Sequence, residues 1–327
     1  MLITLGSPPS AAETAAWHTV VVAAHDLDLP ASVPEPSTTE TAGKLRVHPI
    51  GGRTVHLATT APDGSYEGVA SLLLFTEAEN RHTAFLNALV VRPDARRHGV
   101  GAALWSAVRA ELASAGRGSV STVLEVGGAG EAFVDSLGFT NVLPLGWYVQ
   151  RVRRTLEEIP SPVLPAGLRF ADWTGVVPDA YAASFALAHD AMRDAPAGAL
   201  DERARRWDAE RVRAAARVVE ERGGVIHTSA VLDAGRGDAV VAYTEVVLAD
   251  PADTRALQYD TVVVPGSRGL GLGHAVKRHL LDALCAVRPG VREITTTVAD
   301  DNTAMLAVNE SLGYRRERSA GVFQTKL

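Results

Sequence analysis

With 327 residues, the chain is longer than a typical single domain, which favours two domains of ordinary size. Hydrophobic residues make up 46% and charged residues 21% of the sequence, and the one cysteine, Cys285, excludes an intrachain disulfide, so we expect a globular protein of the reducing cytoplasm. No run of about 18 apolar residues is present and the net charge is −6, so the composition argues against a membrane span and against nucleic acid as the main partner.

The first half of the chain predicts a meander of strands that leads into a helix. Strands are expected at 53–60, 66–75 and 82–91, with the turn sequences PDGS and TEAENR between them. Apolar residues at helical spacing then predict a helix over 100–112. The remaining elements are a strand at 119–126, a short helix within 130–139 and a strand at 146–152 that closes the half.

The second half predicts the same order after two additional helices. Its early elements are a strand at 168–170 and helices over 176–191 and 201–222. Its later elements are strands at 225–233, 238–248 and 255–264, a helix over 271–286, a strand at 293–298, a helix over 302–314 and a final strand at 321–327. Each half is therefore α+β, with a mostly antiparallel sheet and a helix after its central strand.

Matching residues recur at a constant spacing in the two halves. Four pairs are 172 residues apart: Pro93 and Pro265, Arg96 and Arg268, Gly99 and Gly271, Gly101 and Gly273. Downstream, DSLGF at 135–139 matches ESLGY at 310–314 at a spacing of 175. Such a repeat indicates two homologous domains, predicted at 1–154 and 168–327, with a proline-containing linker at 155–167.

The loop between strand and helix in each half has phosphate-binding chemistry. Glycine lets the backbone approach a ligand, the amides at a helix start lack internal partners, and an arginine adds a bidentate phosphate donor. A Walker loop does not fit, because His274 rather than a lysine follows Gly273. A dinucleotide fingerprint does not fit either, because each loop follows a meander late in its half. Both loops therefore predict a pyrophosphate site of another kind.

Both loops fit the pattern R/Q-x-x-G-x-G/A, at Arg96–Gly101 and Arg268–Gly273, and each follows a V-x-P strand end. The sequence N-x-x-M…N-x-x-L-G-Y over 302–314 adds a characteristic closing helix. In this combination the chain resembles the GNAT N-acetyltransferase superfamily over roughly 50–153 and 168–327. The tandem arrangement is similar to the actinobacterial, mycothiol synthase-like branch of that superfamily.

The resemblance implies two tandem GNAT-like domains, each a mostly antiparallel mixed sheet flanked by helices. It also implies acetyl-CoA, or another acyl-CoA, as the cofactor, with the pantetheine arm along the strand ends and the pyrophosphate on the loop amides. The coenzyme-binding residues expected in the first half are Leu89, Val90, Val91, Arg96, Arg97, His98, Gly99, Val100, Gly101 and Ala102. Those expected in the second half are Val262, Val263, Val264, Arg268, Gly269, Leu270, Gly271, Leu272, Gly273, His274 and Asn302.

The resemblance also suggests where a catalytic acid should lie. The family often places a tyrosine seven residues after the asparagine of the closing helix. Counted from Asn302, that position is Asn309 in the second half. In the first half, Gly127 stands at the position of the asparagine and Val134 at the position of the tyrosine. Neither half has the tyrosine, and the first half lacks the asparagine as well.

Candidate bases are carboxylates on the central strands. The second half offers Glu245 and Asp260, whereas the first half has Asn87 at one such position. We therefore expect the C-terminal domain to be catalytic, with Glu245, Asp260 and Asn309 as candidate residues, and the N-terminal domain to be a degenerate copy. Alternatively, Glu245 lies on a solvated strand face, Asp260 caps a turn, and Asn302 is a helix N-cap.

The predicted reaction is transfer of an acetyl group from acetyl-CoA to a primary amine of a small molecule, by direct attack in a ternary complex. The segment 189–212 is expected to line the acceptor site. The histidines show no metal-ligand spacing, so no metal is expected. The alternative is a non-catalytic acyl-CoA-binding sensor or a scaffold.

Overall fold

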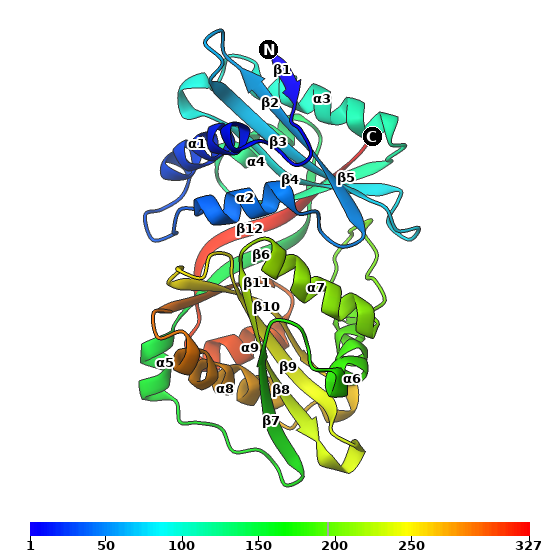
Figure 1. Cartoon of the computed structure of the whole chain (residues 1–327), viewed down its shortest axis with the longest axis vertical. Helices are drawn as coiled ribbons and strands as arrows, with labels where there is room; N and C mark the ends of the chain where they lie inside the picture. The colour runs from blue at the N-terminus through cyan, green and yellow to red at the C-terminus, as the bar shows by residue number, and fades with distance from the viewer. Residues whose placement is uncertain (195) are drawn as a thin grey trace. The chain divides into compact units, whose positions relative to one another are not determined.

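The computed structural model of the chain describes residues 1–194 and 196–327, which form two compact units (Figure 1). The first unit contains Met1–Pro144, Gly198–Arg203 and Ala320–Leu327. The second unit contains Leu145–Ala197 and Ala204–Ser319. The predicted boundaries gave each domain one continuous segment, whereas each compact unit also takes a segment from the other half of the chain.

The sheet of the first unit runs in the order β1-β2-β3-β4-β5-β12. Its strands are β1 (Leu2–Thr4), β2 (Gly52–Thr60), β3 (Tyr66–Phe75), β4 (Thr83–Val91), β5 (Ser119–Glu125) and β12 (Arg315–Lys326), which contributes Ala320–Lys326. β4 and β5 are parallel, and the other neighbours are antiparallel. The predicted meander is thus confirmed, and β3 has the predicted bounds.

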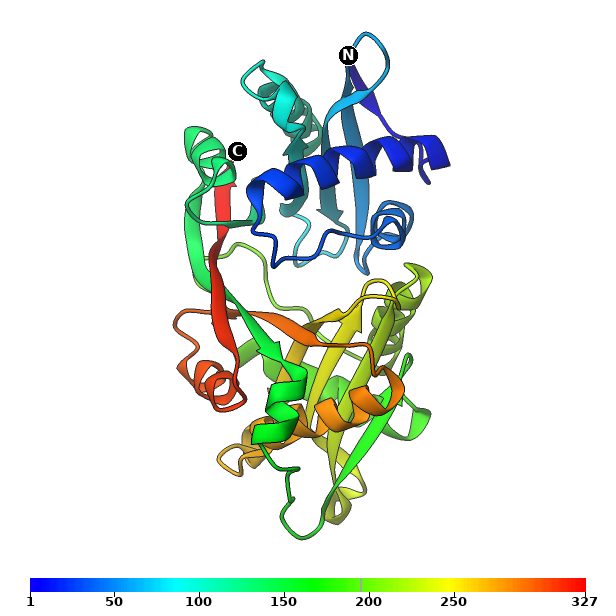
Figure 2. The same ribbon diagram turned by 90° about the vertical axis from the view of Figure 1, so that its left-hand side faces the viewer.

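Helices cover both faces of this sheet. They are α1 (Ala11–Asp28), α2 (Thr38–Arg46), α3 (Val100–Ser114) and α4 (Ala129–Ser136), and Figure 2 shows α1 in front of the strands with α3 behind them. Because successive strand residues point to opposite faces, Val69 packs with Trp17 of α1, while Leu72 packs with Leu104 of α3. Two hydrophobic cores therefore hold the sheet between its helices.

The sheet of the second unit runs in the order β6-β11-β10-β9-β8-β7. Its strands are β6 (Thr140–Arg151), β7 (Leu168–Thr174), β8 (Val225–Asp233), β9 (Ala239–Leu248), β10 (Arg255–Val263) and β11 (Glu293–Ala299). β10 and β11 are parallel, and the other neighbours are antiparallel. The second sheet therefore repeats the plan of the first, as the duplication predicts.

The helices of the second unit again lie on both faces of the sheet. They are α5 (Val152–Glu158), α6 (Asp179–Asp190), α7 (Ala209–Glu221), α8 (Leu272–Val287) and α9 (Thr303–Ser311). Phe185 of α6 packs with Tyr243 on one face of β9, while Val276 of α8 packs with Ala242 on the other face. The strand between α6 and α8 thus directs alternate side chains into two cores.

The strands that close the two sheets are exchanged between the halves of the sequence. We expected residues 146–152 to close the first half, but Leu145–Arg151 pairs with β11 of the second unit. The last strand of the chain, Ala320–Lys326, pairs with β5 of the first unit. Because the halves are duplicates, each closing strand suits either sheet, and local patterning does not distinguish the two pairings.

The structure also corrects several predicted helices. The predicted helix over 201–222 is shorter: α7 begins after Asp208, whose side chain accepts a hydrogen bond from the Arg211 amide. The predicted extended linker at 155–167 begins within α5, and Val152 at the start of α5 is buried in the core around α8. No helix in the described part of the chain has the length and hydropathy that a bilayer crossing requires.

Candidate active site

In each unit two parallel strands separate at an equivalent point. Among the described residues, β4 pairs with β5 along Thr83–Phe85, and β10 pairs with β11 along Arg255–Leu257. Beyond these residues β4 continues to Val91 and β10 to Val263, each bonded to its other neighbour, β3 or β9. The second backbone edge of each strand therefore faces an opening, where an extended ligand arm can add as a further strand.

Both diverging strands contain an irregularity. The register of β4 against β3 shifts at Asn87, and the register of β10 against β9 shifts between Gln258 and Thr261. An extra residue in one strand bends that strand and redirects a side chain, which is a common feature beside functional sites. Asp260, predicted as a candidate base, lies in the second irregularity.

The glycine loop of the first unit borders a cavity of about 440 Å³. Gly99 is the N-cap of α3 at φ 82° and gives no side-chain cap, so the first amides of the helix remain available to a ligand. Arg97 adopts φ 64°, a strained conformation for a residue with a side chain. The predicted coenzyme residues that line this cavity are Leu89, Val90, Val91, Arg96, Arg97, Gly99, Gly101 and Ala102.

A second cavity, of about 260 Å³, lies where β4 and β5 diverge. Leu89, Val90, Gly130 and Phe133 line both cavities, so the two adjoin along β4. Trp105 and other largely buried side chains form its inner wall. The two cavities fit a ligand with an anionic end at the loop and a narrow arm along the strand, as coenzyme A has.

The loop of the second unit has the same backbone design. Gly271 is the N-cap of α8 at φ 72° and again gives no side-chain cap. Leu272 is buried in the core, so only its amide is available to a ligand, while Leu270 is exposed. His274 is half-buried, and burial together with the nearby Arg278 lowers its pKa.

Each loop arginine is already paired with an aspartate. Arg96 donates to both carboxylate oxygens of Asp28, at 2.7 and 2.6 Å, and Arg268 donates to Asp194 at 2.7 Å. Asp28 ends α1, and Asp194 ends the short helix after α6. An incoming phosphate must therefore compete with a carboxylate for each guanidinium.

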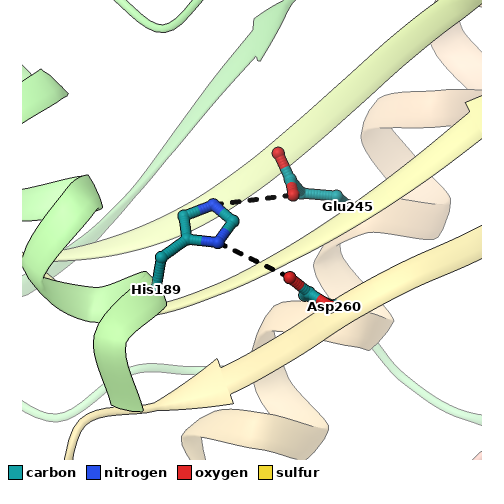
Figure 3. A group of neighbouring side chains, drawn as sticks. All are labelled: His189, Glu245 and Asp260. Atoms are coloured by element: carbon teal, nitrogen blue, oxygen red, sulfur yellow. Dashed lines mark ion pairs between the residues drawn. The ribbon is translucent and has the colours of Figure 1, made fainter. Parts of the chain in front are cut away.

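The two candidate bases meet a buried histidine that the sequence analysis did not single out. His189 Nε2 lies 3.8 Å from Glu245 Oε2, and His189 Nδ1 lies 3.5 Å from Asp260 Oδ2. Figure 3 shows both carboxyl groups on one side of the imidazole, with a dashed line from each ring nitrogen to one of them. The side chains of His189 and Glu245 are 6% and 9% exposed, whereas that of Asp260 is 34% exposed. The predicted alternative of a solvated strand face for Glu245 is therefore wrong.

Local structure explains how this cluster forms. Phe185 and His189 are four residues apart on α6 and so share a face, and Tyr243 and Glu245 are two apart on β9. The His189 ring is stacked on Trp207 at 4.5 Å between centroids and lies 4.6 Å from the rings of both Phe185 and Tyr243. The imidazole is thus enclosed by aromatic rings, with a carboxylate at each nitrogen.

Burial raises the pKa of Glu245 to about 7. The charge of Asp260 acts in the same direction, while His189 and a hydrogen bond from Thr228 act against it. Burial, together with the charges of Asp260 and Glu245, also raises the pKa of Tyr243. A carboxyl group that titrates near neutral pH is suited to accept a proton from a substrate.

The same positions in the first unit carry different side chains. Val91 and Val263 are equivalent, and they pair with Gly68 of β3 and Ala242 of β9, so these two partners are equivalent as well. Three residues further along the two strands, Ser71 of the first unit therefore stands at the position of Glu245 in the second. Ala88 stands 172 residues before Asp260, the spacing of the two glycine loops. The first unit thus retains the loop and the open strand edge without this pair of carboxylates.

Asn309 and Asn302 have other contacts in the structure. Asn309 is buried and accepts a hydrogen bond from Lys277 Nζ at 2.7 Å. Burial lowers the pKa of Lys277 to about 7. The Asn302 side chain accepts from the Met305 amide at 3.2 Å and caps α9. These contacts favour structural roles for both asparagines.

Three features of the site had no clear sequence signal. His189 is one of ten histidines and stands in a segment that we assigned to the acceptor wall as a whole. Asp28 lies outside every predicted element. The contact of Lys277 with Asn309 joins residues 32 positions apart. All three depend on tertiary contacts rather than on periodicity.

Sequence comparison identifies the class of protein that this fold and site define. The acetyltransferase (GNAT) family model matches residues 31–139 and 186–314, which together make up more than half of the chain. The chain therefore belongs to the acetyltransferase (GNAT) family, whose model matches it once in each half.

Its curated relatives include actinobacterial mycothiol acetyltransferases. The chain is 36% identical to that of Mycobacterium marinum over 92 residues, which span 28% of this chain and 27% of the relative's length. It is 27% identical to the mycothiol acetyltransferase of Mycolicibacterium gilvum over 282 residues, covering 80% of each chain. The stronger identity is thus confined to about a quarter of each protein.

Solved structures share the tandem architecture. A tandem GNAT protein from the clavulanic acid biosynthesis pathway superposes with a TM-score of 0.83 at 23% identity, covering 100% of this chain and 98% of that one. A GCN5-related N-acetyltransferase from Sphaerobacter thermophilus gives 0.67 at 16% identity, covering 99% and 95%. At these identities the likeness concerns the fold.

Proposed function

We propose that the protein transfers the acetyl group of acetyl-CoA to a primary amine of a small molecule, by direct attack while both substrates are bound. The GNAT family generally uses acetyl-CoA, and the relatives named mycothiol acetyltransferase support a small-molecule acceptor. The observation that carries the proposal is Glu245, a buried carboxyl group whose pKa is raised to about 7, on β9, which pairs with the edge of β10 opposite to its open edge.

Different groups of the second unit bind acetyl-CoA, orient it and accept the proton of the amine. Acetyl-CoA, when bound, supplies an activated thioester. The amides at the start of α8 hold its diphosphate, and the open edge of β10 orients its arm. Glu245, in its ionised form, accepts the proton that the amine nitrogen loses as its lone pair forms the new C–N bond. The C–S bond would break in the same reaction, and coenzyme A would leave as a thiolate that takes a proton from solvent.

The first unit binds coenzyme without reacting it. Its cavities and its loop suit the same ligand, but Ser71 and Ala88 replace the carboxylates, and an alcohol or a methyl group does not act as a base near neutral pH. We therefore assign catalysis to the second unit and a binding role to the first.

The charge of the cluster suggests the class of acceptor. Two carboxyl groups surround one imidazole, and Asp260 is partly exposed. A cationic amine is attracted to such a site, and Glu245 or Asp260 can accept the proton it must lose before attack. We propose amines that carry no bulky acidic group near the nitrogen.

Thiol release from acetyl-CoA in the presence of a panel of small amines tests this function. We expect turnover with at least one amine. Substitution of Arg268 and Gly271 by alanine should abolish turnover, and the same change at Arg96 and Gly99 should leave most of it. Tight binding of acetyl-CoA without turnover with any amine would support the non-catalytic sensor, and loss of turnover in the first-unit variant alone would reverse the assignment of units.

A further inference from the structure

We propose that His189 is a positioning residue that relays a proton from buried Glu245 to the partly exposed Asp260, and so to solvent. The inference rests on the proposed function, because it concerns the fate of the proton that Glu245 accepts. It adds a role for a residue on α6, outside the strands and loops that hold coenzyme.

The geometry of the ring carries the proposal. Each imidazole nitrogen faces a different carboxyl group, Nε2 toward Glu245 at 3.8 Å and Nδ1 toward Asp260 at 3.5 Å. Figure 3 shows the two carboxyl groups on the same side of the ring, each joined by a dashed line to a different nitrogen. An imidazole can accept a proton at one nitrogen while it releases one at the other, so the ring can pass a proton along this line without rotating once each carboxyl group closes from ion-pair to hydrogen-bond distance.

The exposure of the three groups gives the relay a direction. Glu245 and His189 are almost fully buried, whereas about a third of the Asp260 side chain is exposed. A proton on Glu245 therefore reaches water through the ring and Asp260. The proton balance closes: Glu245 returns to its ionised form, the ring regains its starting number of protons, and one proton enters solvent.

The aromatic rings keep the imidazole in line. Trp207 stacks on His189, and Phe185 and Tyr243 contact it at 4.6 Å between centroids. Trp207 is itself anchored, because its amide donates to Asp190 at 3.0 Å. A ring that only filled space would not require a carboxyl group at each nitrogen.

A bound metal ion is the alternative explanation for this cluster, because one ligand atom from each of the three side chains lies within 4.8 Å of the others. A metal ion binds a single nitrogen of an imidazole and requires its other ligands at about 2 Å from the ion. Here the two contacts use different nitrogens of the ring, as a proton relay requires, whereas a metal ion would use one. A chelator test, given below, separates the two.

Charged and titratable groups from three elements lie around His189. β9 contributes Glu245 and Tyr243, and β10 contributes Asp260. Arg211 of α7 lies behind Trp207, at 5.4 Å from that ring. The charge of His189 lowers the pKa of Glu245, and the charge of Asp260 raises it. Removing the two partners should therefore shift the titration of Glu245 in opposite directions.

The pH dependence of kcat tests the relay in the full chain, with acetyl-CoA and the best amine as substrates. In His189→Gln, kcat should fall by about 10- to 100-fold with an unchanged KM for acetyl-CoA, and the acid limb should move to higher pH. In Asp260→Asn, kcat should also fall, but the acid limb should move to lower pH. The control is His227→Gln, because His227 is also buried in this sheet and contacts Thr174 at 2.8 Å; it should leave kcat and the limb unchanged.

Nitrogen-15 NMR of the imidazole supplies a readout that needs no turnover. Glu245→Gln should change the nitrogen-15 shift of His189 Nε2, and Asp260→Asn that of Nδ1, because each carboxyl group faces one of the two nitrogens. If the wild-type protein turns over no amine, the proposed function fails, while these NMR shifts still decide the coupling of the cluster. An unchanged kcat and acid limb in His189→Gln would overturn the relay, as would activity that a chelator removes and Zn²⁺ restores.

Discussion

The two units place the same backbone design beside different side chains. In both, a strand edge opens beyond a three-residue parallel pairing, and a left-handed glycine begins the next helix without a side-chain cap. The second unit adds Glu245 and Asp260, where the first has Ser71 and Ala88. A site made of backbone groups, such as the proposed coenzyme site, therefore survives changes of sequence, whereas the proposed proton-transfer site is lost with two side chains.

The largest expected effect is the difference in kcat between substitutions at two equivalent positions, Glu245 in the second unit and Ser71 in the first. Glu245→Gln should lower kcat by roughly 10²- to 10⁴-fold, because it removes the base but keeps the shape of the side chain. Ser71→Ala, at the equivalent position of the first unit, should change kcat less than twofold. Thiol release measures both, and calorimetry should show that coenzyme affinity is unaffected. A fully active Glu245→Gln would show that the base lies elsewhere.

The two units also differ in a pair of side chains on and beside the helices that follow the glycine loops. Lys277 stands 172 residues after Trp105, and its ammonium lies 4.5 Å from the centroid of the Tyr314 ring, whereas Trp105 packs on Phe139 at 5.4 Å. The second unit thus holds a lysine–tyrosine pair where the first holds a tryptophan–phenylalanine pair. Burial lowers the pKa of this lysine from 10.5 to about 7, which makes the site sensitive to pH.

Lys277→Met should therefore stabilise the protein. Between pH 7 and 10.5 the unfolded chain holds a proton that the native lysine lacks, so stability falls as pH falls through this range and the penalty is complete at pH 7. We expect a gain of roughly 1–3 kcal/mol at pH 7, after the loss of the bond to Asn309, and a gain that fades toward pH 10. Urea unfolding at several pH values measures it, and a pH-independent difference would argue against a buried amine.

A smaller difference concerns the helices after the second parallel strand. Asn302 caps α9 through its side chain, whereas Gly128 caps α4 without one. Asn302→Ala should cost about 1 kcal/mol of stability, and Gly128→Asn should add a few tenths. Thermal unfolding measures both. If Asn302→Ala instead left stability intact and weakened coenzyme binding, Asn302 would act on the ligand, as the family resemblance suggested.

The smallest expected effect concerns the aspartates that pair with the loop arginines. Asp28→Asn and Asp194→Asn should each raise the affinity of their own unit for acetyl-CoA by about two- to fivefold, because the phosphate no longer competes with a carboxylate. Calorimetry at two salt concentrations should show the gain, and high salt should reduce it. Weaker binding in either variant would mean that the aspartate orients the arginine for the ligand.

Much of the fold could be predicted from short sequence patterns, namely the repeated glycine loops and the strand-like runs. The repeated glycine loops predicted the duplication, and short strand-like runs predicted β3 and β8 with their observed bounds. The exchange of closing strands could not be predicted, since β6 and β12 suit the same place in either sheet. The helix over 201–208 was predicted wrongly, because a charged run has helical composition whether or not a face packs against the sheet.

The candidate site, like the fold, was predicted only in part. Glu245 and Asp260 were predicted as carboxylates on central strands, and the structure brings them to one histidine. His189 itself was missed, because its role depends on α6 packing across β9 rather than on its neighbours in sequence. Asn309 was predicted from its place in a motif, whereas the structure gives it a buried contact with Lys277.

A crystal structure of the chain with a non-hydrolysable acetyl-CoA analogue tests the central claim most directly. We predict an analogue in each unit, with its diphosphate on the loop amides, and the carbonyl group of its acyl end near Glu245 in the second unit alone. An analogue bound to the first unit only, or an acyl end in the second unit directed away from Glu245 and Asp260, would contradict the account.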